Sequence, residues 1–491
     1  MLTMLKNEFN TTTTTNGALA YKSTESKVLD LFSQGGAFRK RDDQDVKSLF
    51  SKAFNENPLL ALKTLFYLRD IREGQGERRF FRTALKHLAL HKPDAVEKNL
   101  HLIPTYGRWD DLLMFLETSL KDQVVALIKA QLAKDLMAKN PSLMAKWLPS
   151  ENTSSPQTQK YARILSRALG LTPREYRKTL SLLRGKLDIV ETKITEKRYE
   201  DIDYSKLPSR AGLILRGAFF RNDEDRYRAF LDSLTKGEVK VNAGALYPND
   251  IVGKILNTTQ RHFGWRSTPQ VTPSDIALFE GMWKNLPDFI GEKQEDSLVM
   301  ADVSGSMSGT PMEVSIALAM YIAERNKGAF HNHFMTFSAR PQLVEIEGSN
   351  IVEKVNNISQ ADWGYNTNIE SALQTILDVA VANNLPSNEV VKKLYIISDM
   401  QFDTATRGTR VNIFKDMEAK FNSYGYEFPN IVFWNVDAHS NTPMKMNDQG
   451  VQLVSGFSPS ILTQLLNADG KTPYDLMLDV IESERYEAVT V

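Results

Sequence analysis

The sequence contains no cysteine and only seven histidines among its 491 residues. The absence of cysteine excludes disulfide bonds, thiolate zinc sites and cysteine nucleophiles, and it is typical of proteins of a reducing cytosol. No stretch reaches the roughly 20 consecutive apolar residues that a membrane-spanning helix needs. The first residues also lack the basic and apolar segments of a secretory signal. We therefore expect a cytoplasmic protein with no membrane partner.

The formal net charge is zero, but the charges are unevenly distributed along the chain. Residues 1–290 hold 46 Lys and Arg against 34 Asp and Glu, whereas residues 291–491 hold 14 against 26, so the two parts carry +12 and −12. This asymmetry favours two units with different partners, a basic one suited to polyanions and an acidic one suited to cations. Attraction between the two parts is the alternative explanation.

Apolar residues of the first part recur at three- and four-residue spacing, which is the pattern of amphipathic helices. The clearest examples are residues 58–72, 77–91, 121–139 and 173–187. Many helices with short connections indicate an α-helical solenoid of the HEAT kind, although no strict repeat is present. We assign residues 1–20 to a flexible N-terminal tail and residues 21–290 to this helical domain.

The pattern changes after Glu292, where short apolar runs alternate with helical segments. The predicted strands are residues 297–304, 333–339, 343–347, 393–399, 430–436 and 451–456, and the predicted helices are 311–326, 369–384, 411–425 and one near 473–485. Continuous apolar strands separated by helices are typical of a parallel sheet that is covered on both faces. Residues 291–491 are therefore predicted to form a doubly wound α/β domain, with its ligand at the carboxyl ends of the strands.

Side chains that carry oxygen gather at this predicted edge. The set consists of Asp302, Ser304 and Ser306 after the first strand, Thr367 in a loop before a helix, and Asp399 at the end of another strand. Two carboxylates and three hydroxyls suit a hard divalent cation such as Mg²⁺. An ordinary turn is the alternative for the DxSxS segment alone, because Ser, Gly and Asp favour turns. A phosphatase of the haloacid dehalogenase type would need a second Asp where the chain has Ser304.

Arginine and lysine side chains line the faces of predicted helices in the first part. One set comprises Arg69, Arg72, Arg78, Arg82 and Lys86, and a second comprises Arg174, Arg177, Lys178 and Arg184. Such stripes are suited to a phosphate backbone. The alternative is that nearby acidic residues pair with the arginines as a structural lattice, namely Asp70, Glu73, Glu77, Asp110 and Asp111. The net charge of +12 favours a polyanion site.

The oxygen-bearing set resembles the metal-ion-dependent adhesion site (MIDAS) of von Willebrand factor A domains. The resemblance implies that Ser304, Ser306 and Thr367 contact the metal, and that Asp302 and Asp399 act mainly through water. A helical domain followed by an A domain is similar to the Ro ribonucleoproteins, which combine a TROVE domain with an A domain. Sequence blocks resemble more closely an uncharacterised Ro-like family recorded only as a domain of unknown function, and these blocks are residues 69–78, 106–112, 145–149, 240–252, 432–435 and 453–458.

The resemblance implies that the chain is a non-enzymatic RNA-binding component of a ribonucleoprotein. Its TROVE-like half would bind a small structured RNA or RNA ends, and its A domain would hold Mg²⁺ or Mn²⁺ and engage an acidic ligand or a partner protein. Two other function classes stay open. One is a protein-interaction or assembly scaffold that uses the metal site and has no RNA role. The other is a hydrolytic enzyme, which is disfavoured because no nucleophile–base pair is evident.

Overall fold

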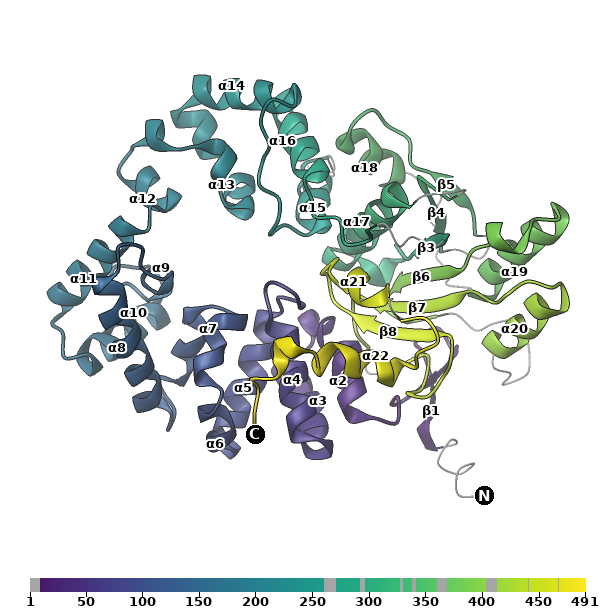
Figure 1. The fold of residues 1–491 in the computed structure, drawn as a ribbon, viewed down its shortest axis with the longest axis horizontal. Coiled ribbons are helices and arrows are strands. Elements are labelled where there is room, and N and C mark those ends of the chain that lie inside the picture. Colours follow the sequence, from purple (N-terminus) through teal and green to yellow (C-terminus); the bar gives the residue numbers. More distant parts are fainter. Residues whose placement is uncertain are drawn as a thin grey trace. The chain divides into compact units, whose positions relative to one another are not determined.

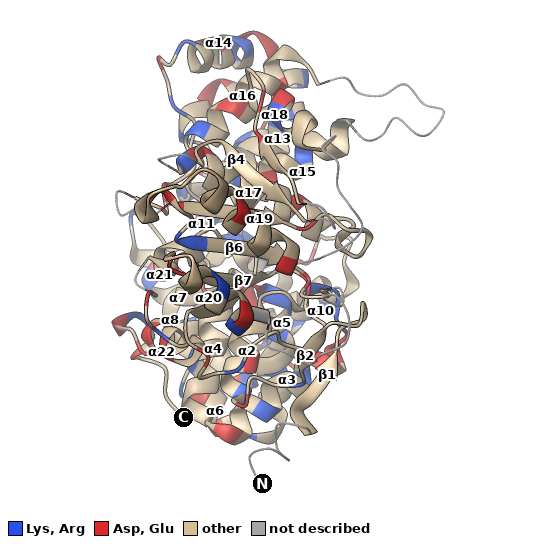
Figure 2. Cartoon of the chain, turned by 90° about the vertical axis from the view of Figure 1, so that its right-hand side faces the viewer, with Lys and Arg blue, Asp and Glu red and all other residues tan. Residues whose placement is uncertain are grey.

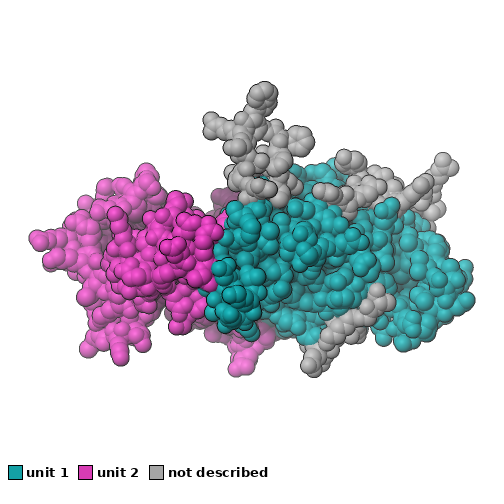
Figure 3. All heavy atoms as spheres, turned by 90° about the horizontal axis from the view of Figure 1, so that it is seen from above, with its two compact units in different colours: residues 1–41, 230–480 teal, residues 42–229, 481–491 magenta. Residues whose placement is uncertain are grey.

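The computed structural model describes residues 9–259, 271–291, 296–326, 330–337, 341–359, 369–402, 413–439, 441–466 and 468–491. The chain divides into two compact units, which Figure 3 shows in different colours. Unit 1 consists of residues 1–41 and 230–480, and unit 2 consists of residues 42–229 and 481–491. This division does not follow the predicted boundaries after residues 20 and 290. The difference arises because residues 1–41 and 230–290 pack with the residues of the α/β sheet and its helices, whereas residues 481–491 pack with the helices of residues 42–229.

The centre of unit 1 is a six-stranded sheet with the strand order β5-β4-β3-β6-β7-β8. Five strands run parallel, namely β3 (Ser297–Ala301), β4 (His333–Thr336), β6 (Lys393–Ser398), β7 (Asn430–Asn435) and β8 (Val451–Ser455). The edge strand β5 (Leu343–Glu345) pairs antiparallel with β4. β3, β6 and β8 are buried along their whole length, which explains why their sequences are continuous apolar runs. All six predicted strands are confirmed.

Helices cover both faces of this sheet (Figure 1). On one side α17 (Thr310–Arg325) packs against β3, β4 and β6. Another hydrophobic core joins α19 (Ile369–Ala382) and α20 (Ile413–Ser423) to alternate strand residues, among them Met300, Ile396 and Phe433. Together with α22 (Pro473–Ile481), these helices correspond to the four that were predicted for the α/β domain.

The N-terminal segment of unit 1 forms secondary structure, which corrects the predicted flexible tail for residues 9–20. β1 (Thr11–Thr13) and β2 (Leu19–Tyr21) pair as an antiparallel hairpin. α2 (Lys27–Gly35) begins after Ser26, whose hydroxyl caps the helix, and residues 28–35 are all buried. This helix packs against β8. Gly36 permits the close approach, because a Cβ atom at this position would lie 2.7 Å from the carbonyl oxygen of Ser455.

Two helices that precede the sheet in the sequence also belong to unit 1. α15 (Pro248–Thr259) packs on α17, and α16 (Pro273–Lys284) packs on α18 (Ile351–Ser359). The indole Nε1 of Trp283 donates to Glu324 at 2.6 Å, and the amide of Phe289 donates to the hydroxyl of Tyr321 at 3.0 Å. Trp283 and Phe289, which flank the end of α16, are therefore attached to α17.

Unit 2 consists mainly of helices. Its longer ones are α3 (Asp43–Glu56), α4 (Pro58–Arg69), α5 (Arg78–His91), α8 (Lys121–Met137), α10 (Pro156–Ala168), α11 (Pro173–Lys186) and α13 (Ser209–Asn222). α4, α10 and α11 each begin with proline after a capping side chain, the common start signal of a helix. The four helices predicted most clearly, α4, α5, α8 and α11, are confirmed. Among the described residues, no helix combines the length and the apolar character that crossing a membrane requires.

Residues 481–491 complete unit 2 from the far end of the chain. The carboxylate of Asp70 is fully buried and accepts hydrogen bonds from the guanidinium of Arg485 and from the hydroxyl of Tyr486. Asp70 follows α4, and the ring of Tyr486 stacks on that of Tyr106 at 5.6 Å between centroids. The buried charge is thus neutralised by a segment more than 400 positions away in the sequence.

Candidate functional site

The carboxylate of Asp302 is buried directly after β3 and is held on both oxygens. Its Oδ1 accepts from the amide of Ser304 at 2.9 Å, and its Oδ2 accepts from the hydroxyl of Ser398 at 2.8 Å. The loop then returns Ser306 to within 3.1 Å of Ser304, measured between the two Oγ atoms. The DxSxS segment therefore forms the tight loop that its spacing predicts, and its hydroxyls are accessible while its carboxylate is not.

The second carboxylate, that of Asp399, follows the neighbouring strand β6 and is also buried. Its Oδ1 accepts from the amide of Gln401 at 3.0 Å, whereas its Oδ2 has no hydrogen-bond partner and lies 3.4 Å from Nε2 of His439. Met400, which lies between Asp399 and Gln401 in the sequence, adopts a left-handed backbone conformation with φ of 63°. Such strain is found at functional sites, where the surroundings hold an unfavourable backbone in place.

Because β3 and β6 are adjacent and parallel, their two carboxylates meet at one edge of the sheet. Burial and the nearby charge of Asp399 raise the pKa of Asp302 to about 6. The site thus combines two buried carboxylates that repel each other, one of which has an unpartnered oxygen, with two hydroxyls. This set of oxygen ligands fits a hard cation chemically. Thr367, the fifth predicted ligand, lies outside the described residues. No group of three or more Asp, Glu, His or Cys side chains within the described ranges could hold a metal ion, so hydroxyl ligands would have to complete the set.

The N-terminal hairpin contacts this site, which the sequence analysis missed. Gln401 accepts from both the amide and the hydroxyl of Thr15 at 2.8 Å, and its carbonyl accepts from the side chain of Asn16 at 2.8 Å. The hydroxyl of Thr14 donates to the carbonyl of Phe402. The hairpin therefore holds the backbone that positions Asp399. The run of threonines was the available signal, since β-branched residues favour strands.

Arg69, a member of the predicted RNA-binding set, is buried, which corrects that prediction. Its side chain is 2% exposed, and its Nε and Nη2 donate to Oδ2 of Asp111 at 2.9 and 2.7 Å. The other carboxylate oxygen of Asp111 accepts from Arg82 at 2.6 Å. Gly107 leaves room for this pair, since a Cβ atom there would lie 2.4 Å from Asp111. Arg69 is therefore inaccessible to RNA. It pairs with an acidic residue as the alternative explanation predicted, and Arg82 does so in part.

The remaining members of the first set lie at the surface. Arg72, Arg78 and Lys86 are exposed. Although Arg78 is exposed as a whole residue, partial desolvation of its guanidinium, followed by the charges of Arg108 and Arg82, lowers its pKa. The guanidinium of Arg108 also stacks on the ring of Trp147 at 4.0 Å. Three of the sequence blocks, residues 69–78, 106–112 and 145–149, are thus brought together in unit 2 by ionic and aromatic contacts.

The second set lies on α11, and the structure adds further cations beside it. The guanidinium of Arg184 is engaged within the protein, because it donates hydrogen bonds to the carbonyls of Ala145 and Leu148 and to the hydroxyl of Ser150. Four other side chains are exposed, and the described residues offer them no hydrogen bond or ion pair: Arg163 and Arg167 on α10, and Arg174 and Lys178 on α11. We call these four the α10–α11 cations. α10 was not examined in the sequence analysis, although its arginines show the same four-residue spacing.

The two compact units carry net charges of opposite sign. Unit 2 contains 35 Lys and Arg against 28 Asp and Glu, a net charge of +7, and unit 1 carries −7. Residues 121–187 alone hold 13 basic and four acidic residues. Figure 2 marks the basic and acidic positions on the elements of both units. The positive charge is therefore concentrated in α8 to α11 rather than spread evenly.

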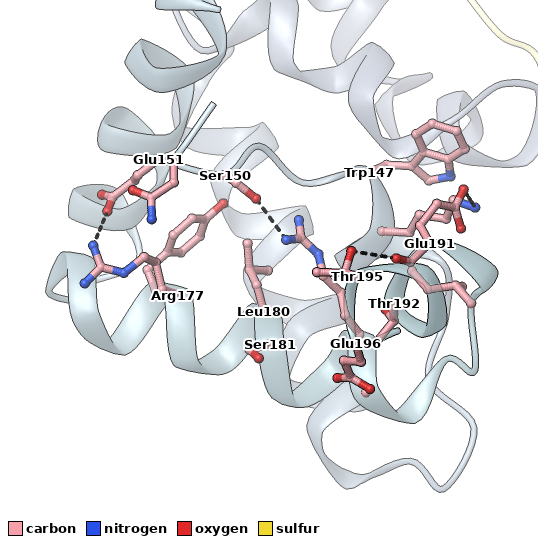
Figure 4. Close-up of a pocket in the computed structure, with 16 residues that line it drawn as sticks. Trp147, Ser150, Glu151, Arg177, Leu180, Ser181, Glu191, Thr192, Thr195 and Glu196 are labelled. Atoms are coloured by element: carbon pink, nitrogen blue, oxygen red, sulfur yellow. Dashed lines mark hydrogen bonds and ion pairs between the residues drawn. The ribbon is translucent and has the colours of Figure 1, made fainter. Parts of the chain in front are cut away.

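A cavity of about 670 Å³ adjoins α11 (Figure 4). It lies between α11, α12 (Val190–Thr195) and the segment that follows α9 (Met144–Trp147). Its lining combines Trp147, Tyr176 and Leu180 with the polar side chains of Ser150 and Glu151. The sequence analysis did not identify this cavity, because its lining comes from three segments that no motif connects.

Comparison with known proteins gives two family matches. Residues 14–142 and 150–295 match the family described as Domain of unknown function (DUF2828), and residues 296–488 match Domain of unknown function (DUF7788). An uncharacterized protein of Acanthamoeba polyphaga mimivirus is 32% identical over 517 residues, which cover 96% of this chain and 87% of that protein. The crystal structure of the Ro (RSR) protein of Deinococcus radiodurans matches with a TM-score of 0.48 and 16% identity, over 91% of this chain and 100% of that one.

The DUF2828 match extends over more than half of the chain, and the viral relative extends over nearly all of it. The prediction of kinship with a family of unknown function is thereby confirmed. The chain belongs to the DUF2828 family.

Proposed function

We propose that the protein is a non-enzymatic RNA-binding protein with two sites, one in each unit. Unit 2 binds the phosphate backbone through the α10–α11 cations. Unit 1 has the adhesion site of a von Willebrand factor A-like domain, which holds a divalent cation and takes an acidic ligand. The observation that carries the RNA proposal is the exposure of Arg163, Arg167, Arg174 and Lys178 without an acidic partner.

Cations without an acidic partner matter because several surface arginines of unit 2 are already neutralised by carboxylates. Arg79, Arg198 and Arg228, for example, each lie 2.7–2.8 Å from a carboxylate. An arginine that is paired in this way must exchange one anion for another when it binds phosphate. The α10–α11 cations pay no such cost, and each releases counterions from the nucleic acid when it binds.

We expect the R163Q/R167Q/R174Q/K178Q variant to bind single-stranded RNA more weakly and with less dependence on salt. Each lost phosphate contact should lower the slope of log affinity against log salt concentration by roughly 0.7, so the slope should fall by about three. Fluorescence anisotropy with a labelled oligouridylate, measured over a series of salt concentrations, gives this slope directly.

The matched control is K52Q/K92Q, which removes two exposed cations from another part of unit 2. This variant should keep the wild-type slope. If the quadruple variant remains folded and its slope equals that of the wild type, the α10–α11 cations are not the RNA site. If the wild type itself binds no RNA, the scaffold alternative is favoured.

The metal proposal rests on the unpartnered Oδ2 of Asp399 beside the hydroxyls of Ser304 and Ser306. These residues, with Thr367 and Asp302, would hold Mg²⁺ or Mn²⁺. The cation would supply a positive point that attracts a carboxylate. An assembly scaffold that uses this site alone, without RNA, is the alternative function.

Divalent cations should stabilise unit 1 of the wild type and should not stabilise the Asp302→Ala variant. Binding to the folded state alone contributes about 2.7 kcal/mol when the metal concentration is one hundred times Kd. Thermal melts in EDTA, in MgCl₂ and in MnCl₂ measure the difference. Asp469→Asn is the control, since Asp469 pairs with Lys393 at the opposite end of β6 and should leave the metal effect intact. Wild-type melting that is unchanged by all three conditions would contradict the site.

A further inference from the structure

The cavity beside α11 is lined by segments that hydrogen bonds join to one another. Arg184 fixes one wall through its three hydrogen bonds to residues 145–150, at 2.8–2.9 Å. The hydroxyl of Tyr176 donates to the carbonyl of Pro149 at 2.9 Å, and the side chains of Tyr176 and Leu180 are buried. A volume of about 670 Å³ lies within the range of small-molecule sites, so the cavity can take a planar ring with its attached sugar.

One polar group in this lining lacks the partner that burial normally demands. The Oε1 atom of Glu151 is buried and has no hydrogen-bond partner, and its Oε2 atom lies 3.5 Å from Nη1 of Arg177. A buried carboxylate oxygen without a donor is costly. Both oxygens therefore favour a ligand that presents two N–H donors side by side. Trp147 provides a partly exposed aromatic ring in the same lining.

The surrounding charge decides which ligand of this kind can approach. Arg177 lines the cavity, and Arg174 and Lys178 lie on the same helix within one turn of it. With a net charge of +9 over residues 121–187, a cationic side chain such as arginine is repelled. An RNA strand instead brings its own negative charge and its own bases. Among the bases, guanine presents adjacent N1–H and N2–H donors on one edge, the geometry that a carboxylate accepts.

We propose that this cavity binds an unpaired guanine base of the RNA, with Glu151 accepting from its N1–H and N2–H groups. The proposal rests on the function proposed above and adds base specificity to it. The phosphates on either side of the base would lie on the exposed cations of α11. An aromatic ring beside the base would add stacking, as in other proteins that bind single strands.

The test compares labelled oligouridylate with the same RNA carrying one central guanosine, and with one carrying inosine in its place. Wild type should bind the guanosine RNA about tenfold more tightly than oligouridylate, because a bidentate contact discriminates by roughly that factor. Inosine lacks the N2 amino group and should fall between the two. Glu151→Gln should abolish the preference for guanosine while leaving the salt slope unchanged.

Glu196→Gln is the matched control, because Glu196 lines the same cavity but its carboxylate is bonded to Arg198 at 2.8 Å. It should keep the preference. If Glu151→Gln disturbs folding, Ser181→Trp offers a second route, since a large side chain in the lining should fill the cavity and remove the preference. Equal affinity of the wild type for all three RNAs, with a normal salt slope, overturns the guanine site alone. Failure to bind any RNA overturns the proposed function as well, and tighter binding of an arginine-rich peptide overturns the choice of ligand.

Discussion

Replacing Asp111 by Asn should lower the free energy of unfolding of unit 2 by about 3–5 kcal/mol. The substitution removes the charge that neutralises Arg69, which is 2% exposed and has no route to solvent. Arg82 loses the same partner on its Nε atom. A buried guanidinium without its carboxylate costs far more than the loss of an exposed pair. Urea denaturation followed by circular dichroism measures the change.

The control for this prediction is Asp43→Asn, which breaks the exposed ion pair between Asp43 and Arg79. Its effect should stay within about 1 kcal/mol, the usual worth of a surface pair. Gly107→Ala should resemble Asp111→Asn, since the added methyl group would lie 2.4 Å from the carboxylate. Equal stabilities of the Asp111 and Asp43 variants would show that the buried pair does not support unit 2.

The second large effect is expected from deletion of residues 1–41, after which unit 1 should no longer unfold cooperatively. The deletion removes α2, whose side chains Val28, Leu29, Leu31 and Phe32 are almost fully buried. At about 1.5–3 kcal/mol for each, their loss costs about 6–12 kcal/mol, which is comparable with the whole stability of a typical domain. It also removes the hydrogen bond from Ser455 to the carbonyl of Phe32.

A fragment that begins at Glu292 should fail in the same way, because it also lacks α15 and α16. The domain boundary after residue 290 that the sequence predicts would instead allow such a fragment to fold independently. Linking residues 9–41 to residues 230–480 should restore cooperative melting, which provides the control. If the short fragment melts at the temperature of unit 1 in the full chain, then α2 is dispensable.

Much of unit 1 could be predicted because each strand carries its own signal. Buried parallel strands are continuous apolar runs, so β3 and β6 were located from local sequence, and the edge at which Asp302 and Asp399 meet followed from their order. The placement of α2 could not be predicted in this way. Its apolar face indicates a buried helix but does not identify β8, which is more than 400 residues away in the sequence, as its partner.

The positions of the basic residues on the helices could be predicted, but their partners in the fold could not. Four-residue spacing correctly predicted that Arg78, Arg82 and Lys86 share a helix, but spacing does not reveal which cations are neutralised. Arg82 pairs with Asp110 and Asp111, which come from a separate segment, whereas Lys86 stays exposed. The unpartnered oxygen of Glu151 is likewise a property of tertiary packing. Charge patterns therefore predict a surface only after the acidic partners are known.

The way that residues 481–491 complete unit 2 has a consequence for the order of events during synthesis. Asp70 is synthesised early. Arg485 and Tyr486, which donate hydrogen bonds to its buried carboxylate, are synthesised only after all of unit 1. While the ribosome translates the α/β sheet, unit 2 must wait with an uncompensated acid next to α4. Its final consolidation is therefore a late step, and nascent chains arrested before residue 481 should remain sensitive to protease within residues 42–229.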